Sequence, residues 1–128
     1  MEKIIGIDVG LKRIGVAFSN GSVVVPLPAV IRKNRNQASR DVSNIINEYK
    51  ADTLIVGLPL SNEEMQRRIK HFVSLLDYNG NIVYIDESYT SAEVEEEIKG
   101  VIKHKKDGRI DSLVAKKLIE RVLNGLNY

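Results

Sequence analysis

Several acidic residues of this sequence lie at the ends of predicted strands or at the start of a predicted helix, where carboxylates could bind a metal ion or take part in catalysis. Asp8 lies near the end of the apolar run IIGIDVG, Asp86 and Glu87 end another apolar run, and Asp111 opens the last helical pattern. A charged side chain in a buried strand costs free energy unless a cation, a helix end or water satisfies it. The simplest alternatives are that Asp8 caps a turn and that Asp111 stabilises a helix dipole.

Taken together, these carboxylates indicate a site for a hard divalent cation. The sequence contains no Cys and two His, His71 and His104, so a zinc–thiolate site, a thiol nucleophile or a Ser-His-Asp triad is not expected. Carboxylate oxygens are ligands that Mg²⁺ and Mn²⁺ accept, and such ions can activate water and hold a phosphodiester. Because neighbouring side chains of a strand point to opposite faces, one of Asp86 and Glu87 should face the site; their spacing leaves open which.

The elements that position these carboxylates follow from the spacing of apolar residues. The first third predicts strands, with a hairpin at Asn20-Gly21 and a sheet-edge strand containing Pro26 and Pro28. The period then becomes helical, and Ser61 with Glu64 predicts a capping box. We expect strands at 3–9, 14–19, 22–32, 53–58 and 81–86, and helices at 37–50, 61–76, 90–98 and from about 110 to 126.

This order of elements predicts an α/β fold. A meander of strands followed by crossover helices gives a mixed sheet with helices on both faces. In such sheets ligands bind beyond the carboxyl ends of the parallel strands. Asp8, the Asp86-Glu87 pair and the start of the closing helix can therefore meet at one edge of the sheet.

Length and composition set the broad class of protein. A chain of 128 residues with 43% hydrophobic and 28% charged residues is expected to form a single domain over residues 1–128. No signal peptide or membrane-spanning run is apparent, and the lack of Cys fits a reducing compartment, so we expect a cytoplasmic protein without a membrane partner.

The distribution of basic residues is more informative than the net charge of +2. Contacts to nucleic-acid phosphates need Lys and Arg in local clusters. Lys12 and Arg13 follow the first strand, and the run 103–106 precedes Arg109 close to Asp111. We expect Lys105, Lys106 and Arg109 to contact nucleic acid beside that carboxylate; a solvated surface loop is the plainer alternative.

Four motifs resemble a bacterial family in the RNase H-like superfamily. They are GIDVGLKRIGVA at 6–17, VGLPL at 56–60, DESYTS at 86–91, and Asp111 followed by a helix. Members of this family are described as pre-16S rRNA nucleases and as Holliday junction resolvase-like proteins. Order, spacing and length all match, so the resemblance covers essentially the whole chain. Sugar kinases and actin-like ATPases open with a similar strand, but they need two such domains.

The resemblance implies a five-stranded RNase H-like sheet and a metal-dependent nuclease. The catalytic and metal-binding carboxylates of the family correspond to Asp8, Glu87 and Asp111, with Mg²⁺ or Mn²⁺ as the cofactor. Lys12 and Arg13 match basic positions that meet the phosphate backbone. The implied role is maturation of the 5′ end of 16S rRNA in the cytoplasm, with RNA and pre-ribosomal particles as partners. Asn20 and Ser88 depart from the family pattern, as does a shortened segment after Leu60.

Rival functions differ in substrate and in chemistry. A junction-resolving DNA endonuclease would work as a dimer, because two strands are cut symmetrically. A catalytically weak nucleic-acid-binding protein would bind without metal-dependent cleavage. A stand-alone fragment related to kinases and actin would be stabilised by nucleotide. RNA is favoured over DNA as the substrate, and the protein is expected to be a monomer or a homodimer.

Overall fold

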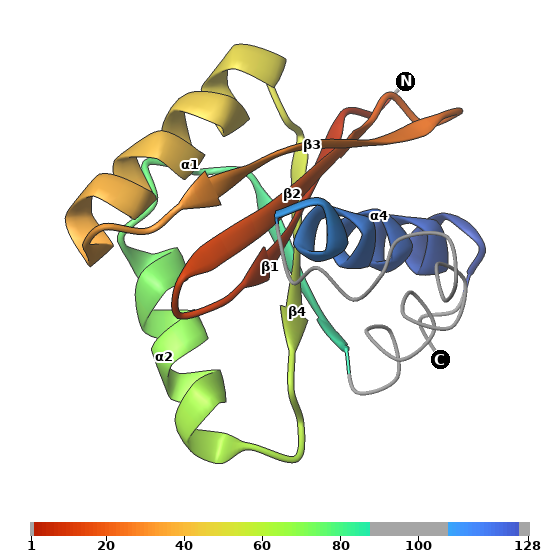
Figure 1. The fold of residues 1–128 in the computed structure, drawn as a ribbon. Helices are drawn as coiled ribbons and strands as arrows, with labels where there is room; N and C mark the ends of the chain where they lie inside the picture. The colour runs from red at the N-terminus through yellow and green to blue at the C-terminus, as the bar shows by residue number, and fades with distance from the viewer. Residues whose placement is uncertain (1, 88–107, 126–128) are drawn as a thin grey trace.

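The computed structural model describes residues 2–87 and 108–125, which form a five-stranded sheet and three helices (Figure 1). The strand order is β3-β2-β1-β4-β5, with β1 antiparallel to β2 and parallel to β4. The expected five-stranded mixed sheet is therefore confirmed. The elements are β1 (Ile4–Val9), β2 (Arg13–Ser19), β3 (Val24–Ile31), α1 (Arg35–Tyr49), β4 (Thr53–Leu58), α2 (Glu63–Ser74), β5 (Asn81–Asp86) and α4 (Gly108–Leu123).

The β2–β3 hairpin has a wider loop than its sequence predicts. Pro26 and Pro28 lie on β3 at the edge of the sheet, as expected, since a missing N–H is tolerated there. Residues 20–23 connect the strands, whereas the Asn20-Gly21 pair predicted a two-residue turn. The Asn20 side-chain oxygen accepts hydrogen bonds from the backbone N–H groups of Ser22 and Val23, at 3.0 and 3.1 Å, and so stabilises the longer loop.

The helix boundaries follow side-chain caps, one of which differs from expectation. Asn34 and Gln37 form a capping box at the start of α1. The Ser61 capping box predicted for α2 is wrong, because Asn62 is the cap and accepts a hydrogen bond from the backbone N–H of Met65 at 3.0 Å. The helix expected at 90–98 lies outside the described residues. No helix in the described ranges is long and apolar enough to cross a bilayer.

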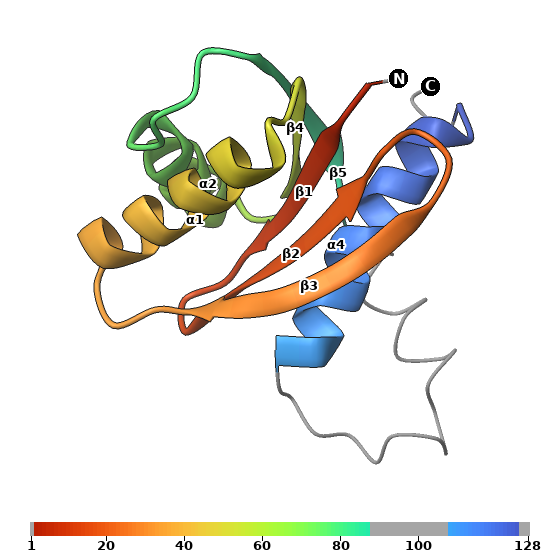
Figure 2. The same ribbon diagram turned by 90° about the horizontal axis from the view of Figure 1, so that it is seen from above.

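The three helices cover both faces of the sheet, as Figure 2 shows: α1 and α2 lie on one face and α4 on the other. Ile5, Ile7 and Val9 of β1 belong to the larger core cluster, which they share with α1 and α2. Ile4 belongs to the smaller cluster with Ala115, Leu118 and Ile119 of α4. Successive residues of β1 therefore pack into the cores on opposite faces of the sheet, and this alternation determines which face the Asp8 side chain is on.

A glycine allows α4 to pack unusually close to the sheet. A Cβ atom at Gly15 of β2 would lie 2.0 Å from the carbonyl oxygen of Asp111, which is far inside any van der Waals contact. Since the obstacle is backbone rather than a movable side chain, a larger residue here would displace the first turn of α4. The position of Asp111 thus depends on a residue without a side chain.

Candidate active site

Asp8 faces the α4 side of the sheet near the carboxyl end of β1. It lies opposite Gly15 in the β1–β2 register, and it shares the parity of Ile4, whose side chain packs against α4. The apolar residues on either side of Asp8, Ile7 and Val9, point into the core beneath α1 and α2. Strand alternation therefore separates the one acidic side chain of β1 from the apolar residues around it.

Glu87 reaches the same face from the end of β5. Its backbone N–H donates to the carbonyl oxygen of Leu58 at 3.0 Å, which continues the ladder between β5 and β4 by one residue. The side chain lies over Gly57, where an added Cβ would be 3.0 Å from Oε2 of Glu87. Asp86 pairs with Leu58, whose side chain belongs to the opposite core, so alternation turns Glu87 rather than Asp86 toward α4. The sequence left open which of Asp86 and Glu87 faces the site, and the structure shows that it is Glu87.

Asp111 lies in the first turn of α4, as expected, and its neighbour Ser112 fixes it to the sheet. The buried Ser112 hydroxyl donates to the carbonyl oxygen of Leu27 at 2.6 Å and accepts from the backbone N–H of Val16 at 3.2 Å. These bonds join α4 to β2 and β3. Ser112 was not anticipated from the sequence; the signal that could have revealed it is a small polar residue on the apolar face of a helix, directly beside a candidate carboxylate.

Arg13 faces Asp111 across the site. Its Nε donates to Oδ2 of Asp111 at 2.7 Å, and each side chain is about one-quarter exposed. A charge-assisted hydrogen bond of this length is among the stronger polar contacts in proteins. Sequence reasoning placed Arg13 on the substrate; the structure places it first on a carboxylate of the site.

The electrostatics of the site centre on Asp8. Burial raises the pKa of Asp8 well above its ordinary value, a hydrogen bond with Glu87 raises it further, and the negative charges of Glu87 and Asp111 act in the same direction. Glu87 Oε2 is buried and has no hydrogen-bond partner among the described residues. The three carboxylates are thus close enough to repel one another, and a cation would relieve this repulsion.

The donor set fits a hard divalent cation. It consists of carboxylate oxygens, it contains no nitrogen or sulfur ligand, and one of its oxygens is buried without a partner. Within residues 2–87 and 108–125, no three His, Cys, Asp or Glu residues already stand at metal-holding spacing. This agrees with Asp111 directing an oxygen to Arg13. The residues that could hold the cation are Asp8 and Glu87. Asp111 could become a third ligand if its hydrogen bond with Arg13 were broken.

The remaining basic residues singled out from the sequence are exposed or lie outside the described residues. Lys12 is exposed in the β1–β2 turn, and Arg109 is exposed at the start of α4; Lys105 and Lys106 lie outside the described residues, as do Ser88 and His104. His71 is exposed on α2. Tyr84, on the edge strand β5, is 38% exposed, with Lys70 Nζ 5.7 Å from its ring centroid.

Some known proteins are similar to this chain in sequence, and others are similar to it in fold. The chain is 51% identical over 126 residues to a protein of Sulfurovum sp. named "Putative pre-16S rRNA nuclease", covering 95% of this chain and 98% of that protein. It is 49% identical over 125 residues to a protein of Sulfurimonas denitrificans with the same name, covering 94% and 96% of the two chains.

Among solved structures, Thermus thermophilus RuvC in complex with a Holliday junction substrate matches with a TM-score of 0.63 at 8% identity, over 98% of this chain and 96% of that one. At this identity the likeness shows the fold alone, and it confirms the expected RNase H-like architecture. The model of the family described as "RuvX: Holliday junction resolvase" matches residues 2–125. The chain therefore belongs to the RuvX family.

Proposed function

We propose that this protein is a nuclease that hydrolyses phosphodiester bonds with a divalent cation held by Asp8, Glu87 and Asp111. The observation that carries the proposal is the convergence of three carboxylates on the α4 face. Asp8 and Glu87 share a hydrogen bond there, while Glu87 Oε2 is buried without a partner. Packing alone gives no reason to gather these charges, whereas a cation would.

The side chains divide the work of such a site. A bound Mg²⁺ or Mn²⁺ would supply activation of water and stabilisation of the leaving oxygen. Asp8 and Glu87 would supply carboxylate oxygens to the cation in a partly buried place, where electrostatic interactions are stronger than in water. Arg13 positions Asp111 through Nε, and its remaining N–H groups can donate to a phosphate oxygen of the substrate.

The favoured substrate is RNA, and the favoured role is processing of the 5′ end of pre-16S rRNA in the cytoplasm. The names of the relatives at about 50% identity support this choice. Precursor rRNA within pre-ribosomal particles would then be the physiological partner. Lys12, exposed next to Arg13, and Arg109, exposed two residues before Asp111, would contact its backbone together with Lys105 and Lys106.

A second candidate function is the resolution of four-way DNA junctions. The description of the family and the fold shared with a junction-bound resolvase favour it. A resolvase must cut two strands symmetrically, so this function would require a homodimer, whereas RNA trimming would not.

Cleavage of two substrates in parallel tests both candidates. Labelled precursor RNA and a four-way DNA junction would be incubated with wild type and Asp8→Asn, in Mg²⁺, Mn²⁺ or EDTA. We expect metal-dependent cutting of the RNA, with the rate falling roughly 10²–10³-fold in Asp8→Asn, the range typical for loss of a group that stabilises transition-state charge. Preferential cutting of the junction would select the DNA function. Undiminished cutting by Asp8→Asn would refute the carboxylate site.

A further inference from the structure

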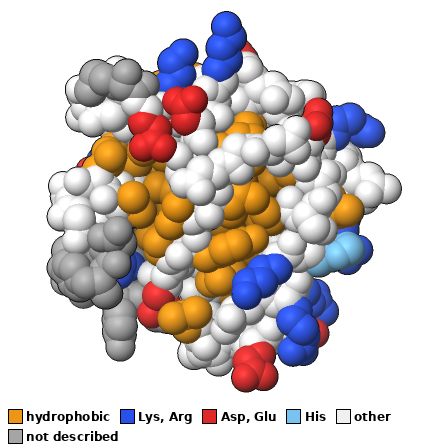
Figure 3. All heavy atoms as spheres, turned by 180° about the vertical axis from the view of Figure 1, so that it is seen from behind, with side chains coloured by type: hydrophobic (Ala, Val, Ile, Leu, Met, Phe, Trp, Pro, Cys, Tyr) orange, Lys and Arg blue, Asp and Glu red, His pale blue; other side chains and the backbone are white. Residues whose placement is uncertain are grey.

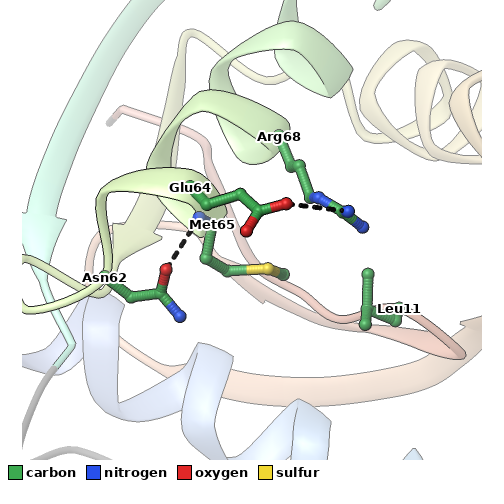
Figure 4. Close-up of a pocket in the computed structure, with 5 residues that line it drawn as sticks. All are labelled: Leu11, Asn62, Glu64, Met65 and Arg68. Atoms are coloured by element: carbon green, nitrogen blue, oxygen red, sulfur yellow. Dashed lines mark hydrogen bonds and ion pairs between the residues drawn. The ribbon is translucent and has the colours of Figure 1, made fainter.

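A basic pocket lies at the same edge of the sheet as the carboxylates but on the opposite face. It is a cavity of about 40 Å³ between the β1–β2 turn, the start of α1 and the first turns of α2. A wider, open hollow of about 250 Å³ adjoins it and shares Leu11, Met65 and Arg68 with it (Figure 4). The cavity is lined by Val9, Leu11, Arg32, Arg35, Met65, Arg68 and Ile69.

The pocket carries a surplus of positive charge. Glu64 pairs with Arg68 at 3.0 Å, and Figure 4 shows this pair at the rim of the hollow. Arg32 and Arg35 make no ion pair with a carboxylate in the described part of the chain. Arg32 and Arg35 line the same cavity; burial lowers the pKa of Arg32, and the charge of Arg35 lowers it further. Two neighbouring cations without a counter-charge form a site for an anion.

Arg32 is held in place before any ligand binds. Its NH1 donates to the carbonyl oxygen of Gly10 at 2.8 Å, and its guanidinium carbon lies 5.3 Å from the centroid of the Phe72 ring. A guanidinium fixed in this way loses little conformational entropy on binding, and its fork of donors suits phosphate oxygens.

Arg35 adds a second feature of an anion site. It is the first residue of α1, a helix of 15 residues with no acidic side chain in its first turn. The positive end of the helix dipole disfavours a cation at this point and favours an anion. His71 Nε2 lies 3.4 Å from Arg35 NH1, so the neighbourhood contains a further basic group. In Figure 3 basic side chains gather beside the pale-blue histidine at one side of the molecule.

The β1–β2 turn connects this pocket with the carboxylates. The turn is closed by a hydrogen bond from the Gly10 N–H to the Arg13 carbonyl oxygen at 2.9 Å. Leu11, three residues after Asp8 and 62% exposed, lines the pocket on one side, while Arg13 contacts Asp111 on the other. A nucleic-acid strand that passes over this turn would meet both sites.

We propose that Arg32, Arg35 and Arg68 form a phosphate-binding pocket that holds the sugar–phosphate backbone of the substrate at a distance from the bond that is cut. The inference rests on the proposed nuclease function for the identity of the substrate. The pocket binds a phosphate group through the arginines, and the apolar side chains of Leu11 and Met65 offer a surface to the adjoining sugar. It contributes to binding rather than to the chemical step.

Binding of a labelled single-stranded RNA in EDTA, measured over a range of salt concentrations, tests the pocket without any cleavage. The variant is the double replacement Arg35→Gln and Arg68→Gln; Arg32 stays because it packs on Phe72. The matched control is Arg40→Gln with Arg67→Gln, which removes the same charge from exposed positions of the same two helices outside the pocket. Thermal unfolding verifies that both variants are folded.

We expect the pocket variant to bind RNA about tenfold or more weakly at 0.1 M salt, with the slope of log K against log salt reduced by about 0.7 because one phosphate contact is lost. The control should stay within about twofold of wild type. Equal losses in both variants, or a slope unchanged in the pocket variant, would overturn the proposal. Because no metal is present, these outcomes are independent of whether the protein cleaves the RNA.

A second arm distinguishes a backbone phosphate from a free one. Inorganic phosphate is titrated into wild type and the pocket variant while thermal unfolding is followed. Weak stabilisation of wild type that is lost in the variant, together with the loss of RNA affinity, supports a pocket for backbone phosphate. Stabilisation by inorganic phosphate with unchanged RNA affinity would assign the pocket to a free anion and refute its role in holding the substrate.

Discussion

The two faces of the sheet place opposite charges at one edge by different means. On the α4 face, glycine at position 15 lets the helix approach until its backbone touches the sheet, and acidic side chains are gathered in a partly buried place. On the other face, large aliphatic side chains fill the core beneath α1 and α2, and Arg32, Arg35 and Arg68 line a small cavity beside an open hollow. Close packing suits a site that must fix atoms for chemistry, while an open basic surface suits one that must hold a long polyanion.

This comparison predicts different kinetic effects for the two sites, and the largest belongs to the carboxylates. Glu87→Gln keeps the shape of the side chain but removes its charge, so we expect kcat for RNA cleavage to fall roughly 10²–10³-fold with KM little changed. The Arg35→Gln, Arg68→Gln double variant should instead raise KM and leave kcat within a few-fold of wild type. Steady-state kinetics of both variants measure these effects. A pocket variant with a lower kcat and an unchanged KM would contradict the different roles assigned to the two sites.

The dependence of Asp111 on Gly15 predicts the next largest effect. Gly15→Val places side-chain atoms where the Asp111 carbonyl oxygen lies, so we expect unfolding free energy to fall by about 1–3 kcal/mol or more and cleavage to be lost. Ile7→Val, which trims the core of the other face, should cost about 0.5–1.5 kcal/mol and leave cleavage intact in the folded protein. Denaturant unfolding measures both. A stable, active Gly15→Val protein would show that close approach of α4 is not needed.

Stability against pH provides a third test, carried out in EDTA. The raised pKa of Asp8 means that its neutral form favours the fold: this contribution is fully present below the ordinary value of 3.8 and is lost as pH rises through the raised value. Asp8→Asn resembles the neutral form at every pH. It should therefore melt a few degrees higher than wild type at neutral pH, roughly the shift caused by 1 kcal/mol or less, and the difference should vanish in acid.

A lower melting temperature for Asp8→Asn would contradict this prediction. A melting temperature of Asp8→Asn that is lower than that of wild type at neutral pH would mean that the Asp8 carboxylate stabilises the metal-free fold. The charge cluster would then be a structural network rather than a site awaiting a cation.

The smallest predicted effect concerns the rim of the basic pocket. Glu64→Gln releases Arg68 from an exposed ion pair, so stability should change by less than about 0.5 kcal/mol. RNA affinity at low salt should rise about two- to fivefold, because the freed charge can contact phosphate. Glu63→Gln, the adjacent exposed carboxylate outside the lining, is the control. Equal gains in both variants would indicate a general charge effect instead of a pocket.

The sequence predicts those parts of the molecule that depend on local patterns. Alternation and helical spacing correctly predict the order of the described elements, the β3 edge and the first-turn position of Asp111, because each is encoded within a few residues. Competing local signals are less decisive: Ser61 and Asn62 can both cap a helix, and the choice between them depends on where the chain leaves β4.

Contacts between distant segments could not be predicted in this way. Arg13 and Asp111 are 98 residues apart, and nothing near either residue specifies the other. The basic pocket combines the end of β3 with the starts of α1 and α2, so its arginines look like ordinary surface charges in the sequence. The choice between Asp86 and Glu87 likewise needed the register of β4 against β5.

Direct measurement of metal binding tests the central claim, that Asp8, Glu87 and Asp111 act as one cation site. Mn²⁺ binding would be followed by electron paramagnetic resonance of the free ion, with wild type, Asp8→Asn, Glu87→Gln, Asp111→Asn and the distant control Asp41→Asn. We predict that wild type and the control bind Mn²⁺ alike, and that each site variant binds it at least about tenfold more weakly. Unchanged Mn²⁺ binding in Asp8→Asn and Glu87→Gln would contradict the account.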